Sequence, residues 1–232
     1  MHILLTRPIE DCEELIIKFK SLGHNISHLP VIKIQSKKYQ EEDFNEYKGI
    51  VFTSSNAIKN LEIKKINKNI YCYCVGLATE KTAKLNGFQN IYTAEGNVNN
   101  LKEIILQTFN TNNGRLLYVS GEIVSSNLDK ELIFEGYSVK RLINYSVLPI
   151  EDLDLRFVDI LKSSMPEIVF IYSQNSAKNF LNLIKKYQLF DFWMNTNLMC
   201  IGEKTSSVLN EIKWKKIFLF NPGEEEFLLY KI

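Results

Sequence analysis

Short apolar runs alternate along this chain with stretches whose apolar residues recur at helical spacing. Residues 3–8, ILLTRP, predict a buried strand. A helix is expected next, over 8–22, with one apolar face made by Ile9, Cys12, Leu15, Ile16 and Phe19. Gly23 then ends the helix, and NISHLPVI (25–32) predicts a second strand. Strand, helix and strand in this order make a βαβ unit.

The same pattern returns in the second half of the chain. RLLYVSG (115–121) predicts a strand, residues 123–134 predict a helix, and YSVKRLINYSV (137–147) predicts an extended segment. Two further pairs of segments match in the same order: 49–61 with 167–181, and 72–96 with 198–223. Three matched pairs in one order indicate an ancient duplication.

Alternating strands and helices of these lengths predict an α/β fold with two doubly wound, parallel-sheet domains. In such sheets, ligands bind beyond the carboxyl ends of the strands. The expected turns at that edge combine Gly, small hydroxyl residues and helix starts, whose free N–H groups attract anions. Ordinary helix capping explains any single one of these turns equally well. Their repetition in both domains favours a ligand with several carboxylates or phosphates.

Composition narrows the class of protein. The 232 residues are 45% hydrophobic and 24% charged, which suits one large or two small globular domains. The net charge of +1 predicts no nucleic-acid partner, and no apolar run reaches the length of about 18 residues that a membrane span needs. The first residues, MHILLTRPIEDCEEL, predict a strand and a helix instead of a signal peptide. We therefore expect a cytoplasmic protein.

No motif for a cofactor or a metal stands out. The four cysteines form no C-x-x-C pair and are expected to be buried, reduced thiols. His24 and His28 belong to a predicted strand segment, where their spacing does not suit a metal pair. Neither a dinucleotide fingerprint nor a Walker loop occurs. We expect no cofactor and no metal.

Over nearly its whole length, the chain resembles the uroporphyrinogen-III synthase family. The matching motifs are LLTRP (4–8), LPVIKI (29–34), VFTSSNAI (51–58), VGLATEKTA (75–83), LLYVSG (116–121), LINYSVLP (142–149), YSQNSAKNF (172–180) and CIGEKTSSVL (200–209). Each motif alone is degenerate, so the resemblance lies in their order and spacing.

The resemblance implies an arrangement that differs from two sequential halves. The two domains would comprise 1–33 plus 150–232, and 36–144. The strands VIKIQ (31–35) and YSVLP (145–149) would pair as a two-stranded antiparallel ladder that joins the domains. Residues 1–29 would then share a sheet with 168–171, and the active site would be a cleft between the domains.

The resemblance also implies a reaction. The substrate would be hydroxymethylbilane, a linear tetrapyrrole with an acetate and a propionate on each ring. Loss of its hydroxyl as water gives an azafulvene cation, and closure with inversion of the last ring gives uroporphyrinogen III. The bilane closes unaided to the uninverted isomer, so the enzyme's main task would be to hold a folded conformer. A general acid for the departing hydroxyl also fits this chemistry.

The family match implies candidate residues. Tyr145 matches the family's tyrosine at the end of the second βαβ unit and would protonate the departing hydroxyl; alternatively, it is only an aromatic residue of the ladder. Ser120 stands where many members carry Arg, and Tyr172 where Thr is usual, so one cation for a carboxylate is missing from position 120. The expected substrate-binding residues all lie in the turns described above: Arg7, Thr53, Ser54, Asn56, Gly76, Thr79, Ser120, Gly121, Ser173, Ser176, Lys204 and Thr205.

Two other classes of function stay open. Two α/β domains around a cleft are also typical of periplasmic solute-binding proteins, although the expected lack of a signal peptide argues against that location. The second alternative is a catalytically degenerate synthase that persists as a two-domain ligand-binding protein. For the enzyme, we expect a monomer that binds the small-molecule bilane, without nucleic acid or membrane.

Overall fold

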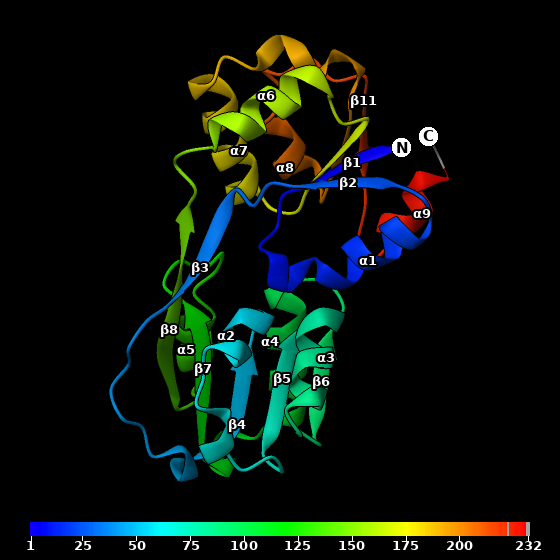
Figure 1. The fold of residues 1–232 in the computed structure, drawn as a ribbon. Coiled ribbons are helices and arrows are strands. Elements are labelled where there is room, and N and C mark those ends of the chain that lie inside the picture. The colour runs from blue at the N-terminus through cyan, green and yellow to red at the C-terminus, as the bar shows by residue number, and fades with distance from the viewer. Residues whose placement is uncertain (222, 231–232) are drawn as a thin grey trace. The chain divides into compact units, whose positions relative to one another are not determined.

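The computed structural model describes residues 1–221 and 223–230 and contains two compact α/β units (Figure 1). Unit 1 comprises Met1–Lys33 with Leu148–Ile232, and unit 2 comprises Ile34–Val147. Unit 2 therefore interrupts unit 1 along the chain. These limits lie close to the expected domain boundaries; that the units fold as independent domains stays a prediction.

The sheet of unit 1 is parallel throughout. Over the described residues, its five strands lie in the order β11-β10-β9-β1-β2. The elements of unit 1 are β1 (His2–Leu5), the 3-10 helix η1 (Ile9–Asp11), α1 (Glu13–Ser21), β2 (Asn25–His28), α6 (Leu155–Ser163), β9 (Ile168–Ile171), α7 (Gln174–Lys186), the 3-10 helix η5 (Phe190–Asn195), β10 (Asn197–Cys200), α8 (Glu203–Ser207), β11 (Lys216–Leu219) and α9 (Glu225–Leu229). The pairing of β1 with β9 confirms that residues 1–29 share a sheet with 168–171.

Helices cover both faces of this sheet, because alternate strand residues point to opposite sides. Leu4 belongs to one buried cluster with Phe180 of α7. Its neighbours Ile3 and Leu5 belong to another cluster, with Phe19 of α1. Burial on both faces explains why the central strands β1, β9 and β10 are mostly apolar, and it confirms the doubly wound fold expected from the sequence.

The sheet of unit 2 is mixed. Over the described residues, its six strands lie in the order β3-β8-β7-β4-β5-β6, of which β8, β7, β4, β5 and β6 run parallel. The elements are β3 (Ile32–Ser36), β4 (Tyr47–Phe52), α2 (Ser55–Lys59), β5 (Tyr71–Val75), α3 (Leu77–Leu85), β6 (Ile91–Ala94), α4 (Val98–Thr108), β7 (Arg115–Gly121), α5 (Leu128–Phe134) and β8 (Val139–Pro149). Helices α2 and α3 pack on one face, and α4 and α5 on the other.

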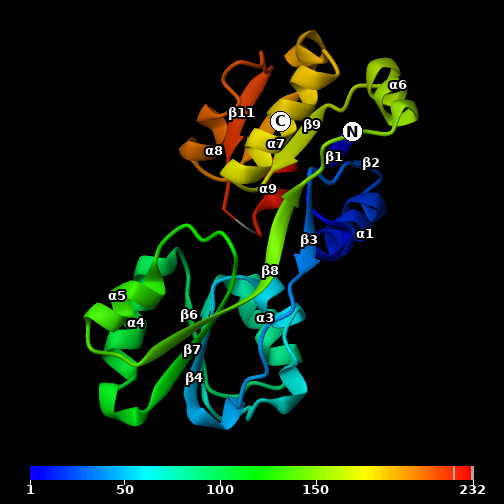
Figure 2. The same ribbon diagram turned by 90° about the vertical axis from the view of Figure 1, so that its left-hand side faces the viewer.

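Strand β3 pairs with β8 at the edge of this sheet (Figure 2). Lys37 donates its N–H to the carbonyl of Asn144 at 2.8 Å, and Ile150 donates to the carbonyl of Val31 at 3.0 Å. In both pairs the two residue numbers add up to the same value, so the numbering rises along one strand as it falls along the other. This is characteristic of antiparallel strands. The predicted antiparallel ladder is therefore confirmed.

One predicted helix begins later than expected. The sequence predicts a helix over 123–134, but α5 begins only at Leu128. Residues 125–127 are Ser-Ser-Asn, whose side chains bond to nearby backbone and so favour turns and caps over helix interiors. The prediction was wrong for these residues, and Ile123 lies in an exposed loop. The first predicted helix likewise divides at Cys12, between η1 and α1.

Candidate functional site

The candidate turns lie at the carboxyl edges of the two sheets. They follow β1, β9 and β10 in unit 1, and β4, β5 and β7 in unit 2. These strands run parallel within each sheet, so their carboxyl ends meet at one edge. Each unit thus gathers its own row of candidates: Arg7, Ser173, Ser176, Lys204 and Thr205 in unit 1, and Thr53, Ser54, Asn56, Gly76, Thr79, Ser120, Gly121 and Tyr145 in unit 2.

Ser54 and Ser173 occupy matching positions before α2 and α7. Their backbones are similar, with φ −156° and ψ 143° at Ser54, and φ −160° and ψ 158° at Ser173. Ser54 Oγ accepts the N–H of Asn56 at 3.2 Å, and Ser173 Oγ accepts the N–H of Ser176 at 3.1 Å. Ser173 also donates to Ser176 Oγ at 2.9 Å. Both serines therefore cap their helices.

A glycine with positive φ opens the second matched pair of turns. Gly76 precedes α3 with φ +78°, and Gly202 precedes α8 with φ +73°, a conformation that residues with a Cβ rarely adopt. No heavy atom lies within 4 Å of a Cβ built at either glycine, so the requirement is conformational and not steric. Thr79 and Thr205, three residues on, are each 4% exposed. The two turns have the same backbone form, and their threonine side chains are buried.

A β-bulge determines where Tyr145 lies. Ser120 on β7 is opposite Ile143, but Gly121 is opposite Tyr145, so Asn144 is an additional residue on β8. A Cβ on Gly121 would lie 2.9 Å from two ring carbons of Tyr145. The ring, 8% exposed, therefore lies against a stretch of backbone that only glycine leaves open.

A cation that was not predicted from the sequence lies beside the end of β7. Arg141, on β8, donates from Nε to Ser120 Oγ at 2.8 Å. Its Nη2 donates to the carbonyl of Gly121 at 2.8 Å and to that of Glu122 at 3.1 Å. Ser120 is buried, and its hydroxyl donates to the Gly121 carbonyl at 3.0 Å. One signal in the sequence could have pointed to Arg141. It lies four residues before Tyr145, on a segment expected to lie beside 115–121.

Thr53 forms a further polar contact at this edge of unit 2. Its Oγ1 lies 3.3 Å from Tyr118 Oη. Burial raises the pKa of Tyr118, while the bond to Thr53 and the charge of Arg141 oppose that rise. Tyr118 therefore stays a neutral phenol that orients the hydroxyl of Thr53.

Arg7 is the corresponding cation of unit 1. Its guanidinium carbon lies 4.6 Å from the ring centroid of Tyr172, a cation–π contact. The carbonyl of Arg7 accepts a hydrogen bond from His28 Nε2 at 2.7 Å, and Nε2 must carry the hydrogen because a carbonyl only accepts. Burial raises the pKa of Tyr172 well above its ordinary value; the carboxylate of Glu225 adds to the rise, and Arg7 lowers it. Tyr172 is thus a neutral ring that supports Arg7.

Lys204 and Asn56 complete the candidate set. Lys204 is exposed, and its carbonyl accepts the Ser207 hydroxyl at 3.1 Å. Asn56 is half-buried, and its carbonyl accepts Asn60 Nδ2 at 2.8 Å. Within each unit, the candidates lie in the turns at the carboxyl edge, at the end of β7 or in the first turn of the following helix. Tyr145 is the exception, because it lies on β8 against Gly121.

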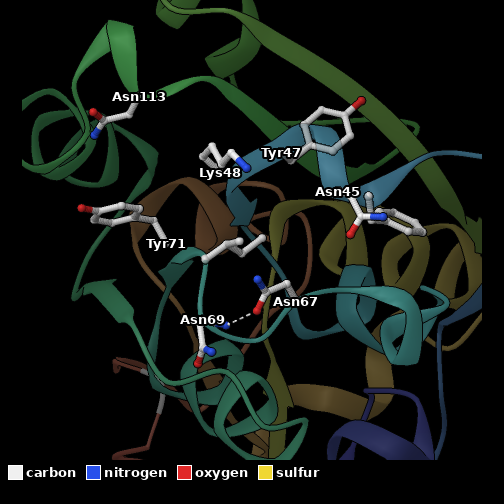
Figure 3. Close-up of a pocket in the computed structure, with 9 residues that line it drawn as sticks. Asn45, Tyr47, Lys48, Asn67, Asn69, Tyr71 and Asn113 are labelled. Atoms are coloured by element: carbon white, nitrogen blue, oxygen red, sulfur yellow. Dashed lines mark hydrogen bonds between the residues drawn. The ribbon is translucent and has the colours of Figure 1, made fainter.

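A cavity of ≈ 550 Å³ lies at the opposite, amino edge of the unit 2 sheet (Figure 3). Its lining is rich in asparagine and consists of Phe44, Asn45, Tyr47, Lys48, Asn67, Asn69, Ile70, Tyr71 and Asn113. Asn67 Oδ1 accepts the N–H of Asn69 at 3.0 Å, so one of these amides stabilises its own turn. These residues precede β4, β5 and β7 or begin β4 and β5, and none of the candidate residues lines the cavity.

The cysteines are buried thiols, as the sequence predicts. Burial raises the pKa of Cys12 and of Cys200 to about 11, so both stay protonated. Across residues 1–221 and 223–230, no group of three His, Cys, Asp or Glu side chains could hold a metal ion. Within the same residues, none of the helices has the length and apolar composition needed to cross a bilayer.

Comparison with known proteins links this fold to one family. The family model for uroporphyrinogen-III synthase HemD matches residues 13–219. The uncharacterized protein RP474 of Rickettsia prowazekii (strain Madrid E) is 22% identical, over 99% of this chain and 97% of that protein.

Two solved structures share the fold. The uroporphyrinogen-III synthetase of Helicobacter pylori 26695 has a TM-score of 0.63 and 20% identity, covering 100% of this chain and 99% of that one. A mutant uroporphyrinogen III synthase of the extremely thermophilic bacterium Thermus thermophilus has a TM-score of 0.54 and 14% identity, covering 100% of this chain and 98% of that one.

Proposed function

We propose that this chain, which belongs to the uroporphyrinogen-III synthase family, closes hydroxymethylbilane to uroporphyrinogen III. It is a cyclising lyase of tetrapyrrole biosynthesis, which removes water from the bilane and inverts the last pyrrole ring. The observation that carries this function is the family match over residues 13–219. That match does not favour the alternatives, a degenerate synthase or a non-enzymatic binding protein.

We propose further that the carboxyl-edge turns of both units bind the carboxylates of the bilane. The start of α3 supports this role, because its N-cap residue, Gly76, has no side chain to cap the first N–H groups. Arg7 and Lys204 would add positive charge, and Ser54 and Ser173 would hold their turns as helix caps. The other proposed contacts are Thr53, Asn56, Thr79, Ser120, Gly121, Ser176 and Thr205.

Tyr145 is the proposed general acid. In the first step, the C–O bond of the bilane's hydroxymethyl group breaks, and the pyrrole nitrogen lone pair forms the azafulvene. The leaving hydroxyl takes the proton of the Tyr145 phenol and departs as water. The phenolate regains a proton when the closed ring loses one. The contact between the Tyr145 ring and Gly121 supports the proposal, because it holds the phenol at the carboxyl edge.

The isomer distribution of the product tests the proposed function. The protein is incubated with freshly prepared hydroxymethylbilane, the products are oxidised, and the uroporphyrin isomers are separated. We expect the inverted isomer to exceed the uninverted isomer that forms in a parallel reaction without protein. The same isomer ratio with and without protein would overturn the proposal.

We also propose that the enzyme is a cytoplasmic monomer that acts on the bilane without cofactor, metal, nucleic acid or membrane. Light scattering after size-exclusion chromatography measures the molar mass, and the absorbance spectrum of the purified protein detects a bound chromophore. A mass of two chains, or a chromophore needed for activity, would contradict the corresponding part of this proposal.

A further inference from the structure

Arg7 and Arg141 differ from the other two of the chain's four arginines in their partners. Arg115 and Arg156 each form an ion pair with a carboxylate. In the described part of the chain, no carboxylate lies within 4.0 Å of the guanidinium of Arg7 or of Arg141. The two arginines without a counter-ion are thus the two at the carboxyl edges, where the candidate residues gather.

The partners of Arg141 are all neutral oxygens. They are the hydroxyl of Ser120 and the carbonyls of Gly121 and Glu122, which occupy Nε and Nη2. A guanidinium has five N–H donors, so the two on Nη1 have no partner among the described residues. The side chain is half-buried. The turn therefore fixes its position and leaves two donors and the whole charge for a ligand.

Among the described residues, the nearby acids form no ion pair with Arg141. The Glu122 carboxylate pairs with Lys37 Nζ at 2.6 Å. Asp129, on α5, and Arg141 both act on the phenol of Tyr118, yet within the described residues Asp129 and Arg141 form no ion pair. A half-buried cation whose partners are neutral attracts an anion more strongly than an exposed, paired one does.

We propose that Arg141 binds a carboxylate of the bilane at the end of β7, and that Ser120 positions it. Arg141 then supplies, from the neighbouring strand, a positive charge to a turn in which Ser120 and Gly121 carry none. The inference rests on the proposed function and adds a residue to its binding site. The N–H groups of Nη1 would donate to the carboxylate oxygens, while Nε and Nη2 keep their bonds to the turn.

Steady-state kinetics of Arg141→Gln with hydroxymethylbilane, at several salt concentrations, test this inference. We expect KM to rise about tenfold, with a smaller change in kcat, because one charge-assisted contact is lost. The decrease of kcat/KM with rising salt should also become shallower, because fewer charges attract the substrate. Arg141→Lys should recover part of the loss, because it keeps the charge.

Arg156→Gln is the matched control, because it removes the same charge from an exposed ion pair. We expect its KM and salt dependence to stay close to those of the parent protein. Loss of kcat and a lower melting temperature in Arg141→Gln, with the parent's KM and salt dependence, would overturn the inference and make Arg141 a structural residue. If the Gln variant does not fold, Ser120→Ala takes its place, because it removes the hydroxyl that accepts the hydrogen bond from Arg141 Nε. The parent's KM and salt dependence in that folded variant would overturn the inference.

A binding measurement separates this inference from the proposed function. Uroporphyrin III carries the same carboxylates as the product, and its fluorescence anisotropy reports binding without turnover. If the parent protein neither converts the bilane nor binds uroporphyrin III, both proposals fail. If the parent does both and folded Arg141→Gln binds uroporphyrin III equally well, only the role of Arg141 fails.

Discussion

The end of β1 in unit 1 and the end of β7 in unit 2 are matching places in the two repeats, yet each obtains its cation differently. In unit 1 the turn itself carries Arg7, supported by the ring of Tyr172. In unit 2 the end of β7 carries the uncharged residues Ser120 and Gly121, and the ring of Tyr145 lies against Gly121. The guanidinium there comes from Arg141 on the next strand. The duplicated edge thus keeps a charge without keeping the residue that carries it.

The neighbouring strands show the same relation. In unit 1, His28 on β2 donates to the carbonyl of Arg7 at 2.7 Å, and in unit 2, Arg141 on β8 donates to the carbonyl of Gly121 at 2.8 Å. In both units a basic side chain of the following strand secures the turn. The hydrogen bond that secures the turn is therefore more alike in the two repeats than the side chains that the turn offers to a ligand.

We expect the largest effect from Tyr145→Phe, because this phenol has no counterpart that could replace it in unit 1. The matching strand there, β2, has the sequence NISH. We expect turnover to slow by about 10²–10⁴-fold, the usual contribution of a positioned general acid. The product should stay the inverted isomer, because the bilane is still folded. Initial rates and isomer ratios measure both effects.

Tyr73→Phe is the control for Tyr145→Phe. It also removes a phenol hydroxyl from unit 2, at 3.0 Å from Thr108 Oγ1, without touching the carboxyl-edge turns. An unchanged rate in Tyr145→Phe would remove Tyr145 from the mechanism. A change to the uninverted isomer would instead make it an orienting residue.

Arg7→Gln, compared with Arg141→Gln, tests whether the two repeats supply equivalent charges. We expect KM to rise about tenfold in each, because each loses one charge-assisted contact. If each arginine binds its own carboxylate, the losses should add in the double variant. A double variant no worse than either single one would show that the two cations serve one carboxylate.

Gly76→Ala and Gly202→Ala test the similarity of the two backbones. Both glycines combine a positive φ, +78° and +73°, with extended ψ, a region that costs residues with a Cβ about 1–3 kcal/mol. Because open space surrounds both positions, we expect similar losses of unfolding free energy in urea titrations. A loss of unfolding free energy in only one of the two variants would show that the turns differ in spite of their similar dihedral angles.

Thr79→Ala and Thr205→Ala should have the smallest effects. Each threonine is 4% exposed, and each change removes one hydroxyl, worth about 1 kcal/mol or about fivefold in binding. Uroporphyrin III titrations of the folded variants measure the change. Complete loss of binding in either variant would mean that this hydroxyl, and not the backbone of the turn, is the main contact.

Much of the fold could be predicted from the sequence, for different reasons in different parts. The alternation of apolar runs and helical stripes predicted sheets covered by helices. The ladder and the interruption of unit 1, in contrast, were predicted from the family resemblance. The start of α5 was missed because Ile123 continues the apolar spacing although residues 125–127 favour a turn. A stripe of apolar positions alone does not locate the first residue of a helix.

The candidate turns could be predicted because Gly76 and Gly202 are local signals of a backbone form. Arg141 could not, because the direction of its side chain depends on how β8 pairs with β7. The additional residue Asn144, which changes the register before Tyr145, has no local sequence signature. Contacts between neighbouring strands are therefore the part of the site that sequence patterns predict least well.

The interruption of unit 1 by unit 2 also sets an order of assembly during synthesis. Strands β1 and β2 leave the ribosome before unit 2, but β9, which pairs with β1, begins only at Ile168. At translation rates of about 5–20 residues per second, β1 waits on the order of ten seconds for that partner. Unit 2 emerges as one continuous segment in the meantime and can complete its sheet first.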